Sequence, residues 1–144
     1  MRQLIIVRKD LEMTPGKLAA QVAHASTAWL TAAIKNDITC HELADGKRFY
    51  STKIRFDQEI YEDWMCGNYT KTICRAKNRG QLLRATDLAA DLNLKEGEDY
   101  FLIKDMCFTE LEPEDENGTT LTCIGFRPLD DELAHTISKK YQLY

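Results

Sequence analysis

Residues 4–26, LIIVRKDLEMTPGKLAAQVAHAS, are the stretch of sequence that decides the fold. Residues 4–7, LIIV, are an unbroken run of β-favouring residues, as expected of a strand that is covered on both faces. Thr14 and Pro15 then supply a hydroxyl at an N-cap position and a proline at the first helical position. Alanine-rich sequence follows, so the pattern predicts a central strand and then a helix that ends at about Lys35.

The predicted helix has two different sides when its residues are placed at 100° intervals. One narrow stripe is mostly polar and consists of Lys17, Gln21, His24 and Ala28. The opposite side, which we expect to face the core, consists of Leu18, Val22, Ala25, Trp29 and Ala33. Lys17 lies in the first turn, where free backbone N–H groups already favour an anion, so a cation there indicates a phosphate or carboxylate site. A solvated surface lysine is the alternative explanation.

Length and cysteine usage limit the class of protein. A chain of 144 residues is long enough for one domain with its own core, so we expect a single domain over residues 1–144. The five cysteines are odd in number and contain no C-x-x-C pair, which favours a cytoplasmic location. Cys40 and His41 are adjacent, but neither has a partner at ligand spacing, so we expect no metal site. We also expect no signal peptide and no membrane span, because the apolar runs are too short.

The charge of the chain is distributed unevenly. The net charge is −4, yet residues 1–85 carry 14 Lys and Arg against 9 Asp and Glu. This half of the chain therefore offers a basic surface that is able to hold phosphates, although solvated helix and strand faces would also explain the charges. The basic residues of this surface are Arg8, Lys9, Lys17, Lys71, Arg75, Lys77, Arg79 and Arg84, and charge alone does not decide between the two explanations. Of these, Arg8, Lys9, Lys17, Lys71 and Arg75 are the ones that we predict to contact nucleic acid.

Beyond the first helix, hydrophobic periodicity and cap residues predict the remaining elements. These are an edge strand or hairpin arm within residues 50–56, a short helix at 60–67, a strand at 71–76, a helix capped by Asn78 that ends before Gly97, strands at 100–103 and 120–126, and a last helix from Asp130 to about Tyr141. The link between the last two strands is too short for a crossover helix. The order predicts an α/β domain of three layers, with a four-stranded mixed sheet flanked by helices.

Four segments of the chain resemble the type 2 peptidyl-tRNA hydrolases, and they occur in the same order as in that family. They are VRKDLEMTPGKLAAQVAHAS at residues 7–26, the tryptophan Trp64 seven residues before Lys71, IKDMCFTEL at 103–111, and TLTCIGFRPL at 120–129. The resemblance implies a cytoplasmic enzyme without a cofactor that hydrolyses the ester between a peptide, or an N-blocked aminoacyl group, and the 3′-terminal ribose of tRNA. It also allows a homodimer.

The resemblance implies a set of site residues. The functional positions of the family correspond to Lys17 and Gln21 of the first helix, Lys71 at the start of the second strand, Asp105 and Thr109 after the third strand, and Thr122 in the fourth strand. We expect Asp105 to position the attacking water rather than to act as a strong base, since a lysine beside it would lower its pKa. His24 matches a family histidine, with either a catalytic role or a role in the core or the helix.

Several departures from the family keep other interpretations open. Phe108 stands where the family usually has arginine, and Asn68-Tyr69 replaces a glycine-glutamine pair. An insertion of about twenty residues falls at about 36–60, and the loop before Thr120 is about five residues longer than usual. One alternative is therefore an inactive module of the same fold that binds tRNA or a protein. Another is a redox or metal protein, or a thiol enzyme that uses Cys107 as its nucleophile.

Overall fold

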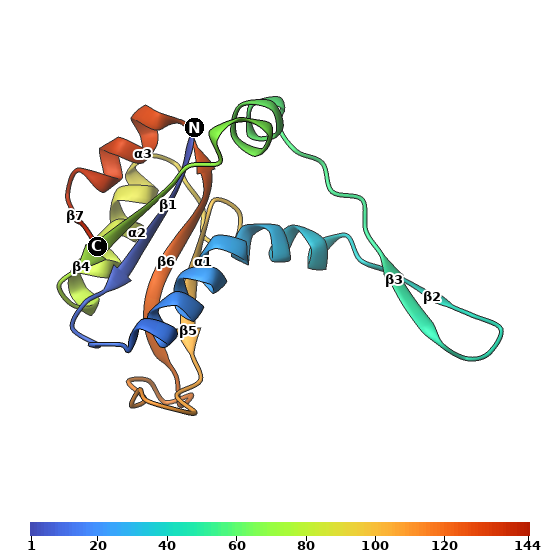
Figure 1. The fold of residues 1–144 in the computed structure, drawn as a ribbon, viewed down its shortest axis with the longest axis horizontal. Helices are drawn as coiled ribbons and strands as arrows, with labels where there is room; N and C mark the ends of the chain where they lie inside the picture. Colours follow the sequence, from blue (N-terminus) through green and yellow to red (C-terminus); the bar gives the residue numbers. More distant parts are fainter.

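A computed structural model describes all residues, 1–144, as a mixed sheet between helices with a long arm at one side (Figure 1). The sheet contains five strands in the order β5-β6-β1-β4-β7. These strands are β1 (Arg2–Arg8), β4 (Lys71–Ala76), β5 (Tyr100–Asp105), β6 (Thr120–Leu129) and β7 (Gln142–Leu143). The prediction of four strands is therefore wrong by one, because β7 has only two residues and is too short to show a period in the sequence.

The strand directions bring three strand ends together. β1 pairs with β4 in parallel, whereas β6 is antiparallel to both β1 and β5. β1, β4 and β5 consequently run in the same direction, and their last residues share one edge of the sheet, which we call the carboxyl edge. Ligands of open α/β sheets collect at such an edge.

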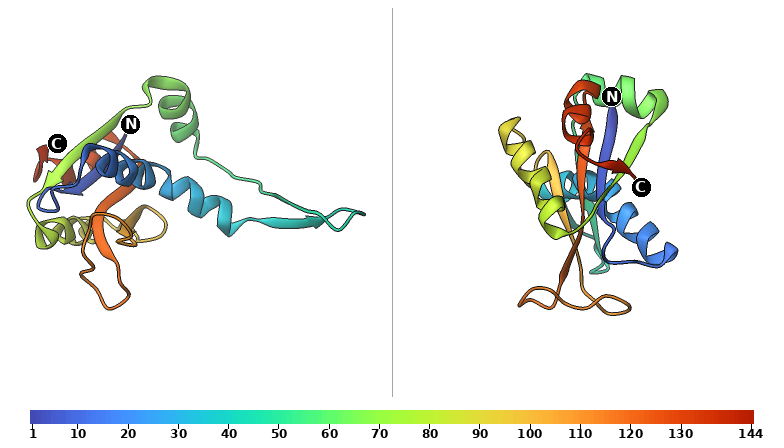
Figure 2. Two further views of the ribbon diagram at one scale, coloured as in Figure 1. Left: turned by 60° about the horizontal axis from the view of Figure 1, so that its bottom comes forward. Right: turned by 90° about the vertical axis from the view of Figure 1, so that its left-hand side faces the viewer.

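Helices cover both faces of the sheet, which confirms the predicted three-layer α/β architecture (Figure 2). One core cluster joins Leu4 and Ile6 of β1 to helices α2 (Arg79–Asp91) and α3 (Asp131–Ser138). A second cluster joins Ile5 and Val7 to helix α1 (Pro15–Asn36) on the other face. β1 is thus buried on both sides, as its unbroken apolar run predicts. No helix combines the length and the apolar character that crossing a bilayer requires.

The helix starts follow the predicted cap residues. Thr14 caps α1, Asn78 accepts a hydrogen bond from the Gln81 N–H at 2.9 Å, and Asp130 accepts one from the Glu132 N–H at 2.8 Å. These oxygens satisfy N–H groups that have no partner within the helix. The last helix ends at Ser138 rather than near Tyr141, because the chain turns there to form β7.

The predicted core side of α1 is wrong in part. Gln21 and Ala25 are the buried residues of α1, whereas Leu18 and Val22 are only half-buried and line an apolar groove of about 590 Å³ beside β4. α1 approaches β6 at Gly125, where an added Cβ would lie 2.3 Å from the Ala25 carbonyl oxygen. This close approach places α1 over β5 and β6 rather than over β4, so the side that carries Gln21 faces the sheet.

Residues 36–60, which the sequence predicts to be an insertion, form an arm that extends from the end of α1 (Figure 1). Strands β2 (Thr39–Glu42) and β3 (Arg48–Ser51) pair as an antiparallel hairpin. The strand predicted at 50–56 is therefore correct only for its first two residues. The chain returns to the body through a short π-helix, η1 (Ile60–Asn68), whose buried Trp64 contacts Trp29 of α1 edge-on at 6.3 Å between ring centroids.

Candidate active site

Asp105 ends β5 at the carboxyl edge, and its carboxylate is held by three donors. The Lys17 ammonium lies 2.6 Å from Oδ2, and the Gln21 amide donates to the same oxygen at 2.8 Å. The backbone N–H of Cys107 donates to Oδ1 at 2.9 Å. Lys17 and Gln21 are four residues apart on α1, so one face of the helix presents both side chains to the strand end. The carboxylate is fixed in position while one lone pair of Oδ1 stays free.

Gln21 is itself oriented by Thr122 of β6. The Thr122 hydroxyl donates to the Gln21 Oε1 at 2.6 Å, which leaves the Nε2 group to donate to Asp105. Gln21 is 2 % exposed and Thr122 is 0 % exposed, so neither side chain reaches solvent. A buried amide without partners would cost free energy, and this chain of hydrogen bonds satisfies both ends of it.

The surroundings of Asp105 shift its pKa in two directions. Burial alone would raise the pKa of Asp105, because it disfavours the charged form. The hydrogen bond from Lys17 opposes that effect, together with the Cys107 N–H, the Lys17 charge and the Gln21 amide, and the net result is a pKa below the ordinary value of 3.8. Asp105 is therefore an ionised carboxylate at neutral pH and a weak base.

Thr109 and His24 lie at the outer side of this site. Thr109 is exposed, and its hydroxyl oxygen accepts a hydrogen bond from the Lys17 ammonium at 3.3 Å. Its hydroxyl hydrogen remains available to a ligand. His24 is exposed on α1, about one turn beyond Gln21, and its ring makes no hydrogen bond. The structure thus brings Lys17, Gln21, Asp105, Thr109 and Thr122 together and leaves His24 beside them.

Glu110 adds a contact that the sequence did not suggest. Its carboxylate accepts hydrogen bonds from the Thr14 N–H at 2.9 Å and from the Thr14 hydroxyl at 2.6 Å. These bonds tie the segment after β5 to the first turn of α1, on which Lys17 stands. The two residues are 96 positions apart, and no local pattern connects them.

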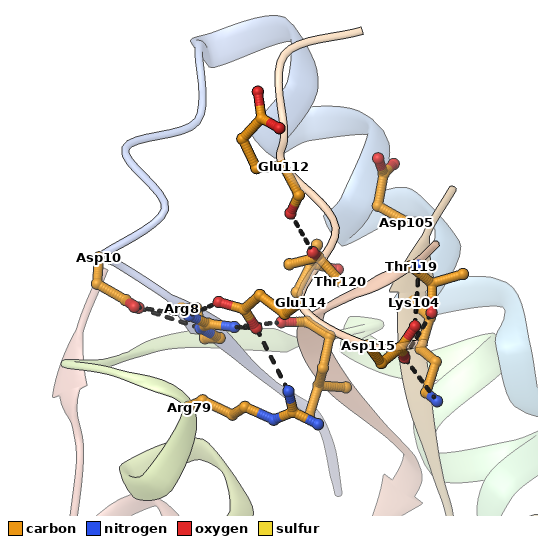
Figure 3. Close-up of polar contacts among 12 residues, drawn as sticks. Arg8, Asp10, Arg79, Lys104, Asp105, Glu112, Glu114, Asp115, Thr119 and Thr120 are labelled. Carbon is orange, nitrogen blue, oxygen red and sulfur yellow. Dashed lines mark hydrogen bonds and ion pairs between the residues drawn. The ribbon is translucent and has the colours of Figure 1, made fainter. Parts of the chain in front are cut away.

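Two ion-pair clusters hold the loop between β5 and β6 (Figure 3). Glu114 pairs with Arg8 and Arg79, and Asp115 pairs with Lys104 and accepts from the Thr119 hydroxyl at 2.7 Å. Arg8 is 3 % exposed, and all five of its N–H donors are used by Asp10, Glu114 and the Leu121 carbonyl. Arg8 is therefore not free to bind a phosphate, although its charge suggested a nucleic-acid contact.

Lys71 does not lie near Asp105. It begins β4 in register with Gln3, whereas Asp105 ends β5, so the two residues are at opposite ends of the sheet and about 20 Å apart along the strands. The Lys71 ammonium instead lies over the Tyr69 ring at 3.3 Å and over the Trp64 ring at 5.0 Å from the centroids. Such stacking stabilises a lysine at the surface.

The remaining candidate residues lie outside the group of hydrogen-bonded side chains around Asp105. Phe108 is 84 % exposed and Met106 is also exposed, so both project from the segment after β5. The Cys107 thiol faces the Asp105 carbonyl oxygen at 3.5 Å and has no basic side chain as a hydrogen-bond partner. His41 stacks on Phe49 in the arm, and no group of three or more His, Cys, Asp or Glu side chains has the spacing of a metal site.

Comparison with known proteins gives a consistent set of relatives. The whole chain, residues 1–144, matches the family described as "Peptidyl-tRNA hydrolase PTH2". It is 31 % identical to a protein of Haloquadratum walsbyi over 144 residues, which cover 100 % of both chains. It is 26 % identical to one of Thermoplasma acidophilum over 142 residues, 99 % of this chain and 97 % of the other, and 31 % identical to one of Methanopyrus kandleri over 131 residues, 91 % and 87 %. Each of these relatives is named peptidyl-tRNA hydrolase.

Proposed function

This chain belongs to the peptidyl-tRNA hydrolase PTH2 family, and we propose that Lys17, Gln21 and Asp105 form its reaction centre. The protein hydrolyses the ester bond between a peptide, or an N-blocked aminoacyl group, and the 3′-terminal ribose of tRNA. The observation that carries the assignment is the Asp105 carboxylate at the carboxyl edge, with a cation on one oxygen and an open lone pair on the other.

Ester hydrolysis needs a positioned water and a route for its proton. The free lone pair of Asp105 Oδ1 accepts a hydrogen bond from that water, and the water oxygen attacks the carbonyl carbon of the ester. The bond from this carbon to the ribose 3′-oxygen then breaks. The proton of the water passes by way of Asp105 to the 3′-oxygen, which leaves as a hydroxyl, and the peptide leaves as a carboxylic acid. The low pKa of Asp105 makes orientation of the water its main contribution.

The developing oxyanion needs a positive partner, which Lys17 supplies. Its ammonium group is held by Asp105 at 2.6 Å and by Thr109 at 3.3 Å, so it is placed before the substrate arrives. Preorganised charge of this kind lowers the barrier because no reorientation is needed during the reaction. The Thr109 hydroxyl hydrogen provides a further donor to the substrate.

Gln21 and Thr122 act through Asp105 rather than on the substrate. Both side chains are buried, so they are positioning residues. Thr122 fixes the orientation of the Gln21 amide, and Gln21 fixes the rotation of the Asp105 carboxylate. An attacking water has to meet the carbonyl carbon in a narrow range of directions, and this support restricts the water to that range.

The replacement of arginine by Phe108 does not disturb the reaction centre. Phe108 projects into solvent, and its side chain takes no part in the hydrogen bonds and the ion pair that join Lys17, Gln21 and Asp105. An exposed aromatic ring at this position is able to stack on an unpaired base of the tRNA 3′ end. No feature of the structure favours an inactive binding module over the hydrolase.

The predicted tRNA contacts that are far from Asp105 receive different roles. Lys71 lies at the other end of the sheet, so we assign it to tRNA binding rather than to bond cleavage. Lys9 is exposed and Arg75 is half-exposed, which leaves both accessible to the nucleic acid. His24 has no partner within the protein that would orient its ring, and we give it no step in the reaction.

We place the protein in the cytoplasm, where its substrate is made and where free thiols such as the exposed Cys40 and Cys66 persist. The apolar groove beside Leu18 and Val22 is the surface that we assign to a homodimer. Light scattering during gel filtration tests this assignment: Val22→Glu is expected to yield monomers, and a wild-type protein that is monomeric at all concentrations contradicts it.

The test of the proposed reaction centre is cleavage of N-acetyl-aminoacyl-tRNA in the presence of a chelator. Lys17→Ala is expected to lower kcat by about 10²- to 10³-fold, because it removes the charge that stabilises the oxyanion. Lys35→Ala, an exposed lysine at the far end of the same helix, is the matched control and keeps the wild-type kcat. Lys71→Ala is expected to raise KM. Equal losses of kcat in Lys17→Ala and Lys71→Ala would contradict the placement of the reaction centre.

A further inference from the structure

A second concave surface lies at the carboxyl edge and contains only polar and cationic side chains. It has a volume of about 300 Å³ and is lined by Lys9, Arg75, Lys77, Gln81, Lys140 and Gln142. We call it the basic pocket. Its four cations come from three places in the sequence, because Lys9 follows β1, Arg75 and Lys77 stand at the end of β4, and Lys140 follows α3.

The four cations of the basic pocket have no acidic partner, although they are gathered around one cavity. Lys47, Lys95 and Lys104 each pair with a nearby carboxylate. In contrast, none of the four cations of the basic pocket has a carboxylate within 4.0 Å. Four like charges around one small cavity repel one another. An anion bound between them would offset this repulsion, because each of the four cations attracts it.

Arg75 is held in place for such an anion. Its guanidinium donates to the Gln142 Oε1 from Nε at 3.3 Å and from Nη2 at 2.8 Å, and the Nη1 group makes no hydrogen bond. Gln142 belongs to β7, which pairs with β4 at this point. The short last strand therefore orients a guanidinium whose remaining donors are free, and guanidinium groups bind phosphate oxygens with defined geometry.

The cationic surface continues beyond the basic pocket. A neighbouring hollow of about 310 Å³ shares Lys77 and Gln81 with it and is also lined by Asn78, Gly80 and Arg84. This hollow contains no acidic and no apolar side chain either. A surface of this length suits a chain of phosphates better than a single small anion.

The basic pocket and the reaction centre share the carboxyl edge. Asp105 ends β5, and Arg75 stands near the end of β4, which is three positions away in the strand order β5-β6-β1-β4. Three strand spacings amount to about 14 Å. An RNA strand whose 3′ end lies at Asp105 would cross this distance within a few nucleotides and place its backbone over the basic pocket.

We propose that the basic pocket binds a backbone phosphate of the tRNA substrate, at a distance from the ester. The proposal rests on the proposed function for the identity of the nucleic acid. Lys9, Lys77 and Lys140 neutralise the phosphate, and Arg75 orients it through its free guanidinium donors. The contact reads no base, so it serves affinity and position of the tRNA rather than sequence preference.

The experiment compares two triple variants of equal charge. The first is Lys9→Gln/Lys77→Gln/Lys140→Gln, and the control changes three exposed lysines away from the basic pocket, Lys35→Gln/Lys53→Gln/Lys95→Gln. Binding of labelled, deacylated tRNA is measured by fluorescence anisotropy over a range of salt concentrations. Because this tRNA has no ester, the measurement is independent of the reaction. The pocket variant is expected to bind more weakly, and the slope of log K against log salt is expected to shrink by about one for each phosphate that the variant no longer neutralises.

A small substrate separates this proposal from the proposed function. An N-acetyl-aminoacyl ester of adenosine carries the scissile ester but no backbone phosphate. It reaches Asp105 but not the basic pocket, so the pocket variant is expected to cleave it with the wild-type kcat. Failure of the wild-type protein to cleave this substrate would contradict the proposed reaction centre. The anisotropy measurement would still test the basic pocket, because it does not depend on cleavage. Equal binding and equal salt slopes for the wild type and the pocket variant would overturn the proposal, as would equal effects of the two triple variants.

Discussion

Thr122→Val tests whether a buried hydroxyl sets the orientation of the catalytic carboxylate. Valine has nearly the shape of threonine, so the substitution removes one hydrogen-bond donor with little change in packing. The Thr122 hydroxyl donates to the Gln21 Oε1 at 2.6 Å, and Gln21 in turn donates to Asp105. Without this donor the Gln21 amide is free to rotate. Its Nε2 group then donates to Asp105 in only a fraction of the molecules.

The size of the effect follows from burial. Gln21 Oε1 would be left without a partner in a site that solvent does not reach, which lowers the free energy of unfolding by about 1–3 kcal/mol. A hydrogen bond to a charged group such as Asp105 contributes about 1.5–3 kcal/mol. If half of that support is lost in the transition state, kcat falls about three- to twelvefold, since each 1.4 kcal/mol is a factor of ten. KM is expected to stay the same, because Thr122 does not contact the tRNA.

The assay is steady-state hydrolysis of N-acetyl-aminoacyl-tRNA together with urea unfolding. Thr120→Val is the matched control: Thr120 is buried two residues earlier in the same strand, and its hydroxyl donates to the Glu112 carbonyl at 2.6 Å, outside the Asp105 network. Thr120→Val is therefore expected to keep the wild-type kcat. A wild-type kcat in Thr122→Val, or an equal loss of kcat in both variants, would refute the positioning role of Thr122.

Three further predictions concern packing, pH and substrate binding. Gly125→Ala would push a methyl group into the α1 backbone and lower the free energy of unfolding, measured in urea, by about 1–3 kcal/mol. Gly16 has open space around it, so the control Gly16→Ala is expected not to lower this free energy. Equal stabilities of the two variants would contradict the close approach of the two backbones. The lowered pKa of Asp105 stabilises the folded protein above pH 3.8, and this stability is lost as the pH falls through the folded-state pKa. Lys17→Gln removes the ammonium group that lowers the pKa of Asp105, so NMR titration is expected to show a higher pKa of Asp105 in this variant. An unchanged pKa would exclude Lys17 as the cause. Phe108→Ala is expected to raise KM at least fivefold, because about 1–3 kcal/mol of base stacking is lost. Phe108→Tyr keeps an aromatic ring and is expected to keep the wild-type KM. An unchanged KM in Phe108→Ala would exclude stacking.

Elements with local signals were predictable from the sequence. Thr14-Pro15 and Asp130 mark helix starts because capping involves neighbouring residues only, and the apolar run of β1 reports burial on both faces. β7 and the end of α3 were missed for the opposite reason. A two-residue strand has no period, and its pairing with β4 depends on how the whole chain folds back.

The residues of the candidate site also divide into those with a local signal in the sequence and those whose place depends on distant parts of the chain. The first-turn position of Lys17 indicates an anion, and the structure places the Asp105 carboxylate there. The burial of Gln21 could not be predicted, because it follows from the approach of α1 to Gly125 about a hundred residues later. Basic character alone likewise suggested Arg8 as a phosphate ligand, whereas Glu114, 106 residues away, uses its guanidinium. Partners this distant leave no pattern in a single sequence.

The most direct test of the reaction centre is single-turnover cleavage of N-acetyl-aminoacyl-tRNA by the wild type and by Asp105→Asn, with binding of deacylated tRNA measured in parallel. Asparagine keeps the shape of the side chain and removes its charge. We expect that the wild type cleaves the ester, that Asp105→Asn loses at least about 10²-fold in rate, and that both proteins bind tRNA. Cleavage by Asp105→Asn at the wild-type rate would contradict the assignment of the reaction centre.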